Sequence, residues 1–160
     1  MSVTKTSNAQ TEGCRPLYER DYYEWTQQNV RAIREGRLRE VDWANVAEEL
    51  EDMGRSERRA LRSQLARLIA HLLKWSYQTE RRRASEHSWR ATIEHARDSV
   101  RELLDDNPSL KPQLPEFLPA AYRDALAQVV GETNLPRQNF PAACPWTLDQ
   151  VMDDDFWPEG

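Results

Sequence analysis

The side chains in this sequence that could bind a metal ion or transfer a proton are concentrated in one acidic stretch. Residues 48–52 include Glu48, Glu49, Glu51 and Asp52. On a helix, Glu48 and Asp52 stand one turn apart and share a face. Two carboxylates at this spacing would bind a divalent cation or take part in acid–base chemistry. We favour a solvated helix face, because like charges at this spacing cost only about 0.2–0.5 kcal/mol.

A histidine further along the chain is the second candidate for chemistry. If two helices formed a hairpin here, His71 would meet Glu49 or Asp52 across it, with Trp75 one turn further on. The resulting candidate pocket contains the residues Glu48, Glu49, Asp52, His71 and Trp75. The Glu-x-x-His motif of metal-binding helical bundles is missing. A histidine hydrogen-bonded at the edge of the core is therefore the simpler interpretation, and we assign no metal and no cofactor.

The middle of the chain is strongly basic, although the net charge of the whole is −5. Residues 54–101 hold 12 Lys and Arg against 5 Asp and Glu, whereas the acidic residues outnumber the basic ones on either side. The candidate residues for binding an anion are Arg58, Arg62, Arg81, Arg82 and Arg83. These arginines do not line one helix face, and no phosphate-binding loop accompanies them. Salt bridges to the acidic segments are the favoured interpretation, and nucleic acid is the less favoured partner.

Cysteine usage and hydropathy bear on where the protein works. The two cysteines, Cys14 and Cys144, form neither a disulfide framework nor a ligand cluster, which fits a reducing compartment. No apolar signal segment opens the sequence, and the longest apolar stretch, around residues 68–75, is too short to span a membrane. We therefore expect a cytoplasmic protein with no membrane partner.

Helices must position all of these side chains, because no alternating pattern typical of a strand occurs. The predicted fold is all-α, a bundle of about five helices with an extended C-terminal wrap. Residues 1–14 are predicted to be a disordered tail, and residues 15–160 a single domain. The caps and the apolar periodicity predict helices over residues 21–35, 42–53, 56–77, 85–106 and 119–133.

Two of these helices are specified most clearly. Asp42 is the expected N-cap of the second helix, whose apolar stripe contains Trp43, Val46 and Leu50 and which Gly54 is expected to end or loosen. The third helix is apolar on nearly all sides over its second half, which is typical of a buried helix. We expect it to be the centre of the bundle.

Several short motifs, taken together, resemble a known family. They are DWANVAEELEDMGRSERRAL, HLLKWSYQTERR, SWRATI, NPSLK, FPAACPW and DDDFWPE, and they cover roughly residues 18–159. In this order they are similar to the bacterial family catalogued as domain of unknown function 29. The link ERRRASEHSW is a residue or two longer than in that family. The resemblance implies a small bacterial helical bundle and carries no catalytic residues.

Three functional hypotheses follow from the sequence. The first is a binding or interaction module without catalytic activity, whose partner is another protein or a second copy of the chain in a homodimer. The second is a metal-dependent enzyme or metal-binding protein that uses the carboxylate and histidine pocket. The third is anion or nucleic-acid binding through the basic segment 54–101.

Overall fold

The computed structural model describes residues 15–159, and every regular element in that range is helical. The prediction of an all-α fold is confirmed. The elements are α1 (Leu17–Arg20), α2 (Tyr22–Arg34), η2 (Leu38–Glu40), α3 (Trp43–Tyr77), α4 (Thr79–Asp106), η3 (Pro108–Gln113), α5 (Leu114–Glu132), η4 (Arg137–Asn139) and α6 (Leu148–Met152). None of the helices within residues 15–159 combines the length and apolar character that a membrane-spanning segment needs.

Contacts divide the chain into two compact units, residues 1–52 and residues 53–160, which we call the N-terminal unit and the C-terminal unit. Each is described by itself. The predicted tail, residues 1–14, lies outside the described residues. The prediction that residues 15–160 form a single domain stays a prediction.

The helix α3 differs from the prediction. Residues 42–53 and 56–77 were expected to form two helices, but Trp43–Tyr77 is one continuous helix of 35 residues. Gly54 has no positive φ angle, and no proline follows it. A glycine inside a helix costs only about 1 kcal/mol relative to alanine, which the helix formers on both sides offset. By contrast Gly36, at φ 72°, follows the end of α2 as predicted.

The N-terminal unit is held together by a small polar and aromatic cluster. The carboxylate of Asp21 caps α2 by accepting a hydrogen bond from the backbone N–H of Glu24, as predicted. Nε1 of Trp25 donates to the Asp42 carboxylate at 3.0 Å, and the buried Asn29 accepts from the backbone N–H of Asp42 at 2.8 Å. These bonds connect α2 to the start of α3 through two buried or half-buried side chains.

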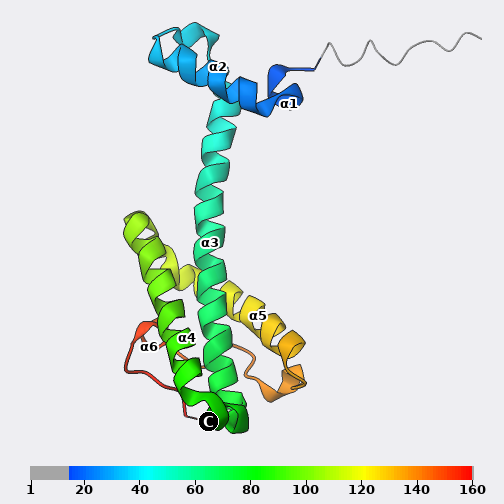
Figure 1. Ribbon diagram of the computed structural model, residues 1–160, viewed down its shortest axis with the longest axis vertical. Helices are drawn as coiled ribbons and strands as arrows, with labels where there is room; N and C mark the ends of the chain where they lie inside the picture. The colour runs from blue at the N-terminus through cyan, green and yellow to red at the C-terminus, as the bar shows by residue number, and fades with distance from the viewer. Residues whose placement is uncertain (1–14, 160) are drawn as a thin grey trace, which may run out of the picture. The chain divides into compact units, whose positions relative to one another are not determined.

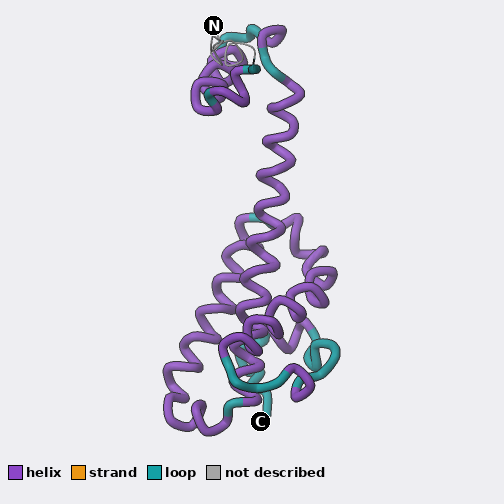
Figure 2. The backbone as a smooth tube through the Cα atoms, turned by 90° about the vertical axis from the view of Figure 1, so that its right-hand side faces the viewer, coloured by secondary structure: helices purple, strands orange, loops and turns teal. Residues whose placement is uncertain are grey.

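The C-terminal unit has a complete hydrophobic core. The second half of α3 lies between α4 and α5 in Figure 1, and Figure 2 shows that helices joined by loops make up the unit. The prediction that this half is buried is confirmed, since Leu61, Leu65, Leu68, Ile69 and Leu72 have no exposed surface. From α4 come Ile93, Ala96, Val100 and Leu104, and from α5 come Phe117, Ala121, Tyr122, Ala125, Leu126 and Val129.

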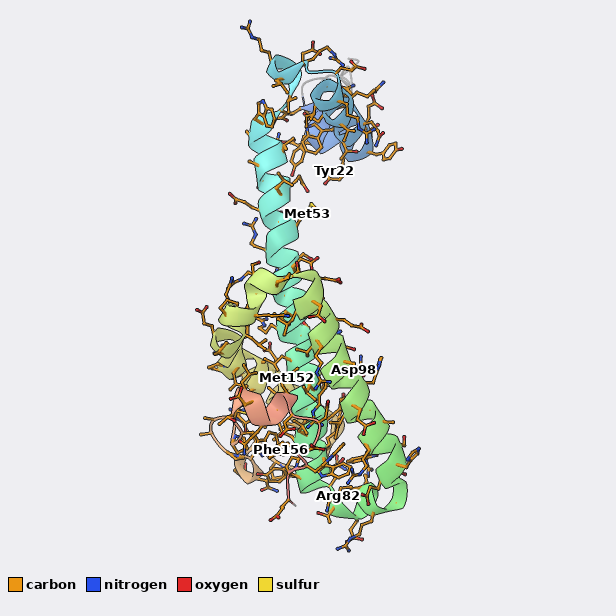
Figure 3. All side chains as sticks on the ribbon, turned by 90° about the vertical axis from the view of Figure 1, so that its left-hand side faces the viewer. Tyr22, Met53, Arg82, Asp98, Met152 and Phe156 are labelled. Carbon is orange, nitrogen blue, oxygen red and sulfur yellow. The ribbon has the colours of Figure 1, made fainter. Side chains whose placement is uncertain are left out.

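A C-terminal strap, residues 151–157, closes this core. It lies along α4, and Figure 3 labels Met152 and Phe156 in it. The guanidinium of Arg97, which is fully buried, donates to the backbone carbonyls of Val151 at 3.1 Å and Phe156 at 2.8 Å, and more weakly to that of Asp154 at 3.4 Å. Trp157 packs on the ring of Trp75 with centroids 4.8 Å apart.

Two predicted helix starts are displaced. No helix was predicted over residues 78–84, but residues 79–84 are helical because α4 begins at Thr79, and Ser85 interrupts this helix as a kink with φ −145°. The helix α5 begins at Leu114 rather than at Pro119. Pro115 occupies its first turn, where the N–H that proline lacks would have no helical partner.

Candidate functional site

The apolar stripe predicted at the start of α3 is largely exposed in the structure. The exposed fractions of Trp43, Leu50 and Met53 are 52%, 62% and 64%. Two apolar residues of α2, Val30 and Ile33, are 40% and 42% exposed. Large apolar side chains are usually covered, so the exposure of four of them in the N-terminal unit, Val30, Ile33, Trp43 and Leu50, points to an interaction surface.

The acidic stretch has a structural role that the sequence did not indicate. The two carboxylate oxygens of Glu49 accept hydrogen bonds from the hydroxyls of Tyr18, at 2.6 Å, and Tyr22, at 2.7 Å. Donating a hydrogen bond to Glu49 raises the pKa of the Tyr18 hydroxyl to about 12. The same interaction raises the pKa of Tyr22. Glu49 therefore connects α1 and α2 to α3 within the N-terminal unit.

The predicted pocket of Glu48, Glu49, Asp52, His71 and Trp75 depended on a hairpin between two helices. That premise is wrong, because one continuous helix contains all five residues. Trp75 is buried in the C-terminal core, with the guanidinium of Arg82 5.1 Å from its ring centroid. Within residues 15–159, no group of three or more His, Cys, Asp or Glu side chains is arranged to hold a metal ion.

Most of the candidate anion-binding arginines have partners within the C-terminal unit. Arg58 hydrogen-bonds to Gln113 and lies over the ring of Phe117. Arg62 pairs with Asp124 at 3.1 Å. Arg82 donates to the backbone carbonyl of Trp75, and Arg83 pairs with Glu80 at 3.3 Å. The remaining member of the set, Arg81, lines a pocket.

That pocket lies where the end of α3, the first half of α4 and the end of α5 meet. Its volume is about 300 Å³. The lining residues are His71, Lys74, Gln78, Arg81, Ser88, Trp89, Thr92, Ile93, Glu132 and Thr133. We call it the His71 pocket. Two predicted candidates, His71 and Arg81, are therefore brought together at a site that neither hypothesis described.

The imidazole of His71 stays neutral at neutral pH mainly because it is largely buried. Burial lowers the pKa of His71 to about 4, and the positive charges of Lys74 and Arg67 add to this effect, whereas Glu132 opposes it. Lys74 Nζ lies 2.8 Å from the Glu132 carboxylate, and this hydrogen bond lowers the pKa of Glu132. At neutral pH the His71 pocket thus contains a neutral imidazole beside a lysine–glutamate ion pair.

The depressed pKa of His71 predicts acid sensitivity. In the unfolded chain the imidazole binds a proton below about pH 6.5, but in the folded protein only below about pH 4. The unfolded state therefore binds more protons between these values, and stability falls as the pH drops through that window. We expect His71 to account for about 2 kcal/mol of this loss, a value reduced for its partial exposure.

Urea denaturation between pH 7 and pH 4 measures this contribution. His71→Gln should flatten the decline, whereas His87→Gln, at an exposed position of α4, should leave it unchanged. Equal pH profiles for the wild type and His71→Gln would show that His71 titrates normally.

Two features of the C-terminal unit had no signal in the sequence. The burial of Arg97 is one, because nothing separated it from the other arginines of the basic segment. The approach of Lys74 to Glu132 is the other, since 58 residues separate them and only the tertiary fold pairs them.

Comparison with known proteins places the chain in a family. No curated protein and no solved structure has significant similarity to it. A sequence model described as domain of unknown function DUF29 matches residues 17–157, in agreement with the resemblance of the motifs. The chain therefore belongs to the family of domain of unknown function 29.

Proposed function

We propose that this protein is an interaction module that forms a homodimer through its N-terminal unit. The observation that carries the proposal is the exposed apolar surface of that unit, which we call the apolar face. It consists of Val30, Ile33, Leu38, Trp43 and Leu50, each at least 40% exposed. In the C-terminal unit, by contrast, a large core is fully buried.

The size of the N-terminal unit supports a need for a partner surface. Its buried apolar side chains, within the described residues, are Trp25, Ala32 and Val41. A core made of so few buried apolar side chains gives the unit little stability of its own. Association that covers the apolar face would supply this stability, because burying apolar surface contributes roughly 25 cal/mol per Å².

Charge favours a second copy of the same chain as the partner. In the sequence, Ile33 of α2 is followed by Arg34, while Leu50 of α3 comes two residues after Glu48. In a dimer with a twofold axis, α2 of one copy can contact α3 of the other. The symmetry then produces the same contact a second time. Each copy thus brings a cationic and an anionic border to the same interface, and complementary borders favour the correct register.

The place of action is also part of the proposal. We infer that the module works in the bacterial cytoplasm, as the membership in the family and the cysteine usage suggest. Cys144 is a free thiol, and burial raises its pKa, which keeps it in the unreactive protonated form. This state suits a reducing compartment.

Placing a charge in the apolar face tests the proposal, and Leu50 is the most exposed of its residues. Leu50→Asp would bury two uncompensated carboxylates in each dimer, so we expect the dimer to weaken at least about 100-fold. Sedimentation equilibrium measures the mass independently of shape: the wild type should have twice the 18.8 kDa of one chain, and the variant 18.8 kDa.

Ala91→Asp is the matched control, because it places the same charge at an exposed position of α4 in the C-terminal unit. It should remain dimeric. A wild-type protein that sediments as a monomer at high micromolar concentration would refute the homodimer, as would a Leu50→Asp variant that dimerises like the wild type.

A further inference from the structure

The lining of the His71 pocket combines three kinds of chemistry. Ser88 and Thr92 contribute hydroxyls and Gln78 an amide, whereas Trp89 and Ile93 are apolar. Lys74, Arg81 and Glu132 are charged. A cavity of about 300 Å³ with this mixture is at the small end of pockets that bind organic molecules.

The charge of the pocket is positive once its ion pair is counted. Glu132 is neutralised by Lys74 at 2.8 Å and also accepts a hydrogen bond from Gln128 at 2.8 Å. Arg81 lines the pocket and is exposed, so its guanidinium can reach a ligand bound there. A planar guanidinium binds a carboxylate with two parallel hydrogen bonds, which makes a carboxylate the natural complement.

A polar atom in the wall also lacks a partner. Nε2 of His71 is buried and makes no hydrogen bond within the described structure. Buried polar atoms in folded proteins are nearly always paired, and an unpaired one costs about 1–3 kcal/mol by general experience. A polar group of a bound molecule would satisfy this nitrogen.

From these observations we propose that the His71 pocket binds a small organic carboxylate with a planar or branched apolar body. The carboxylate pairs with the guanidinium of Arg81, the body packs on Trp89 and Ile93, and a polar group of the ligand meets Nε2 of His71. This site lies in the C-terminal unit, so the inference goes beyond the proposed homodimer and is independent of it.

Benzoate is a suitable probe, since it carries a carboxylate on a planar apolar ring. Titration of the full-length protein up to ~10 mM, followed by NMR, should shift the indole N–H signal of Trp89 and the imidazole signals of His71. Trp89→Phe and His71→Gln assign these signals. Benzamide, which has the same shape without the charge, should bind at least about tenfold more weakly.

A pair of arginine variants separates the pocket from general electrostatics. Arg81→Gln removes the cation of the pocket and should weaken benzoate binding at least about tenfold. Arg83→Gln removes the same charge two residues away, from an exposed arginine that pairs with Glu80 outside the lining, and should leave binding unchanged. Both positions are exposed, so both variants should fold.

Three results would overturn the proposal. The first is the absence of shifts at Trp89 and His71 in the benzoate titration. The second is equal binding of benzoate and benzamide, which would remove the role of the charge. The third is inorganic phosphate that displaces benzoate at equal concentration, which would indicate a site for simple anions rather than for an organic carboxylate.

Discussion

Replacing Arg97 with methionine is expected to lower the free energy of unfolding by about 3–5 kcal/mol. The guanidinium is fully buried and donates to the backbone carbonyls of Val151, Asp154 and Phe156. Methionine fills most of the volume but donates no hydrogen bond, so the carbonyls of the strap are left without donors. Trp157 also loses a cation, which now lies 5.3 Å from its ring centroid.

Two further variants define the cause of this loss. Arg101→Met removes a half-exposed arginine that donates to the Met152 carbonyl and pairs with Asp154 at 2.7 Å, and should cost only about 1 kcal/mol. Arg97→Lys keeps the charge, but a lysine cannot reach all three carbonyls. Its cost in unfolding free energy should lie between those of Arg101→Met and Arg97→Met. Urea denaturation gives the stabilities. If Arg97→Met and Arg101→Met cost the same, the burial of Arg97 is not what stabilises the strap.

The second large effect is expected in the centre of the core. Leu68 has no exposed surface and lies in the part of α3 enclosed by α4 and α5. Leu68→Ala removes its packing and leaves a cavity, which should cost about 3 kcal/mol, within the 2–5 kcal/mol typical of such truncations. Thermal and urea unfolding of the full-length protein measure this loss.

Leu103→Ala is the matched truncation, because Leu103 on α4 is partly buried and packs at the margin of the same core. It should cost less than half as much, since the cavity it leaves is open to water. Equal losses for the two variants would mean that α3 is not the centre of the C-terminal unit.

Local signals in the sequence predicted much of the C-terminal unit. The stripe of Leu61, Leu65 and Leu68 follows the period of a helix, and a helix that is apolar on nearly every side is buried wherever it lies. The same holds for the cap at Asp21 and the glycine at position 36, whose effects depend on only a few neighbouring residues. These features could be predicted because they depend on residues that are close together in the sequence.

The predictions were wrong where a single residue was taken to end a helix although the residues around it favour helix. Gly54 suggested a helix end, but a mid-helix glycine without a following proline or a left-handed residue does not stop a helix. The loss of that break removed the hairpin on which the metal-site hypothesis depended. The stripe at Trp43 and Leu50 has helical period as well, and period alone does not say which surface covers it.

The candidate site could be predicted only in part. His71 and Arg81 were both identified from the sequence, each within a different hypothesis. Their meeting in one pocket depends on α4 and α5 packing against the end of α3, with Glu132 brought to Lys74. Contacts between residues so far apart in the chain produce no local pattern from which a single sequence could predict them.

The central claim is that a second copy of the chain covers the apolar face of the N-terminal unit. Amide hydrogen exchange of the full-length protein over a dilution series tests it most directly. Because dimerisation stabilises by mass action, the amides of α2 and of residues 43–50 should lose protection on dilution, while those of residues 61–75 keep theirs. Exchange rates in the N-terminal unit that do not change with concentration would contradict the claim.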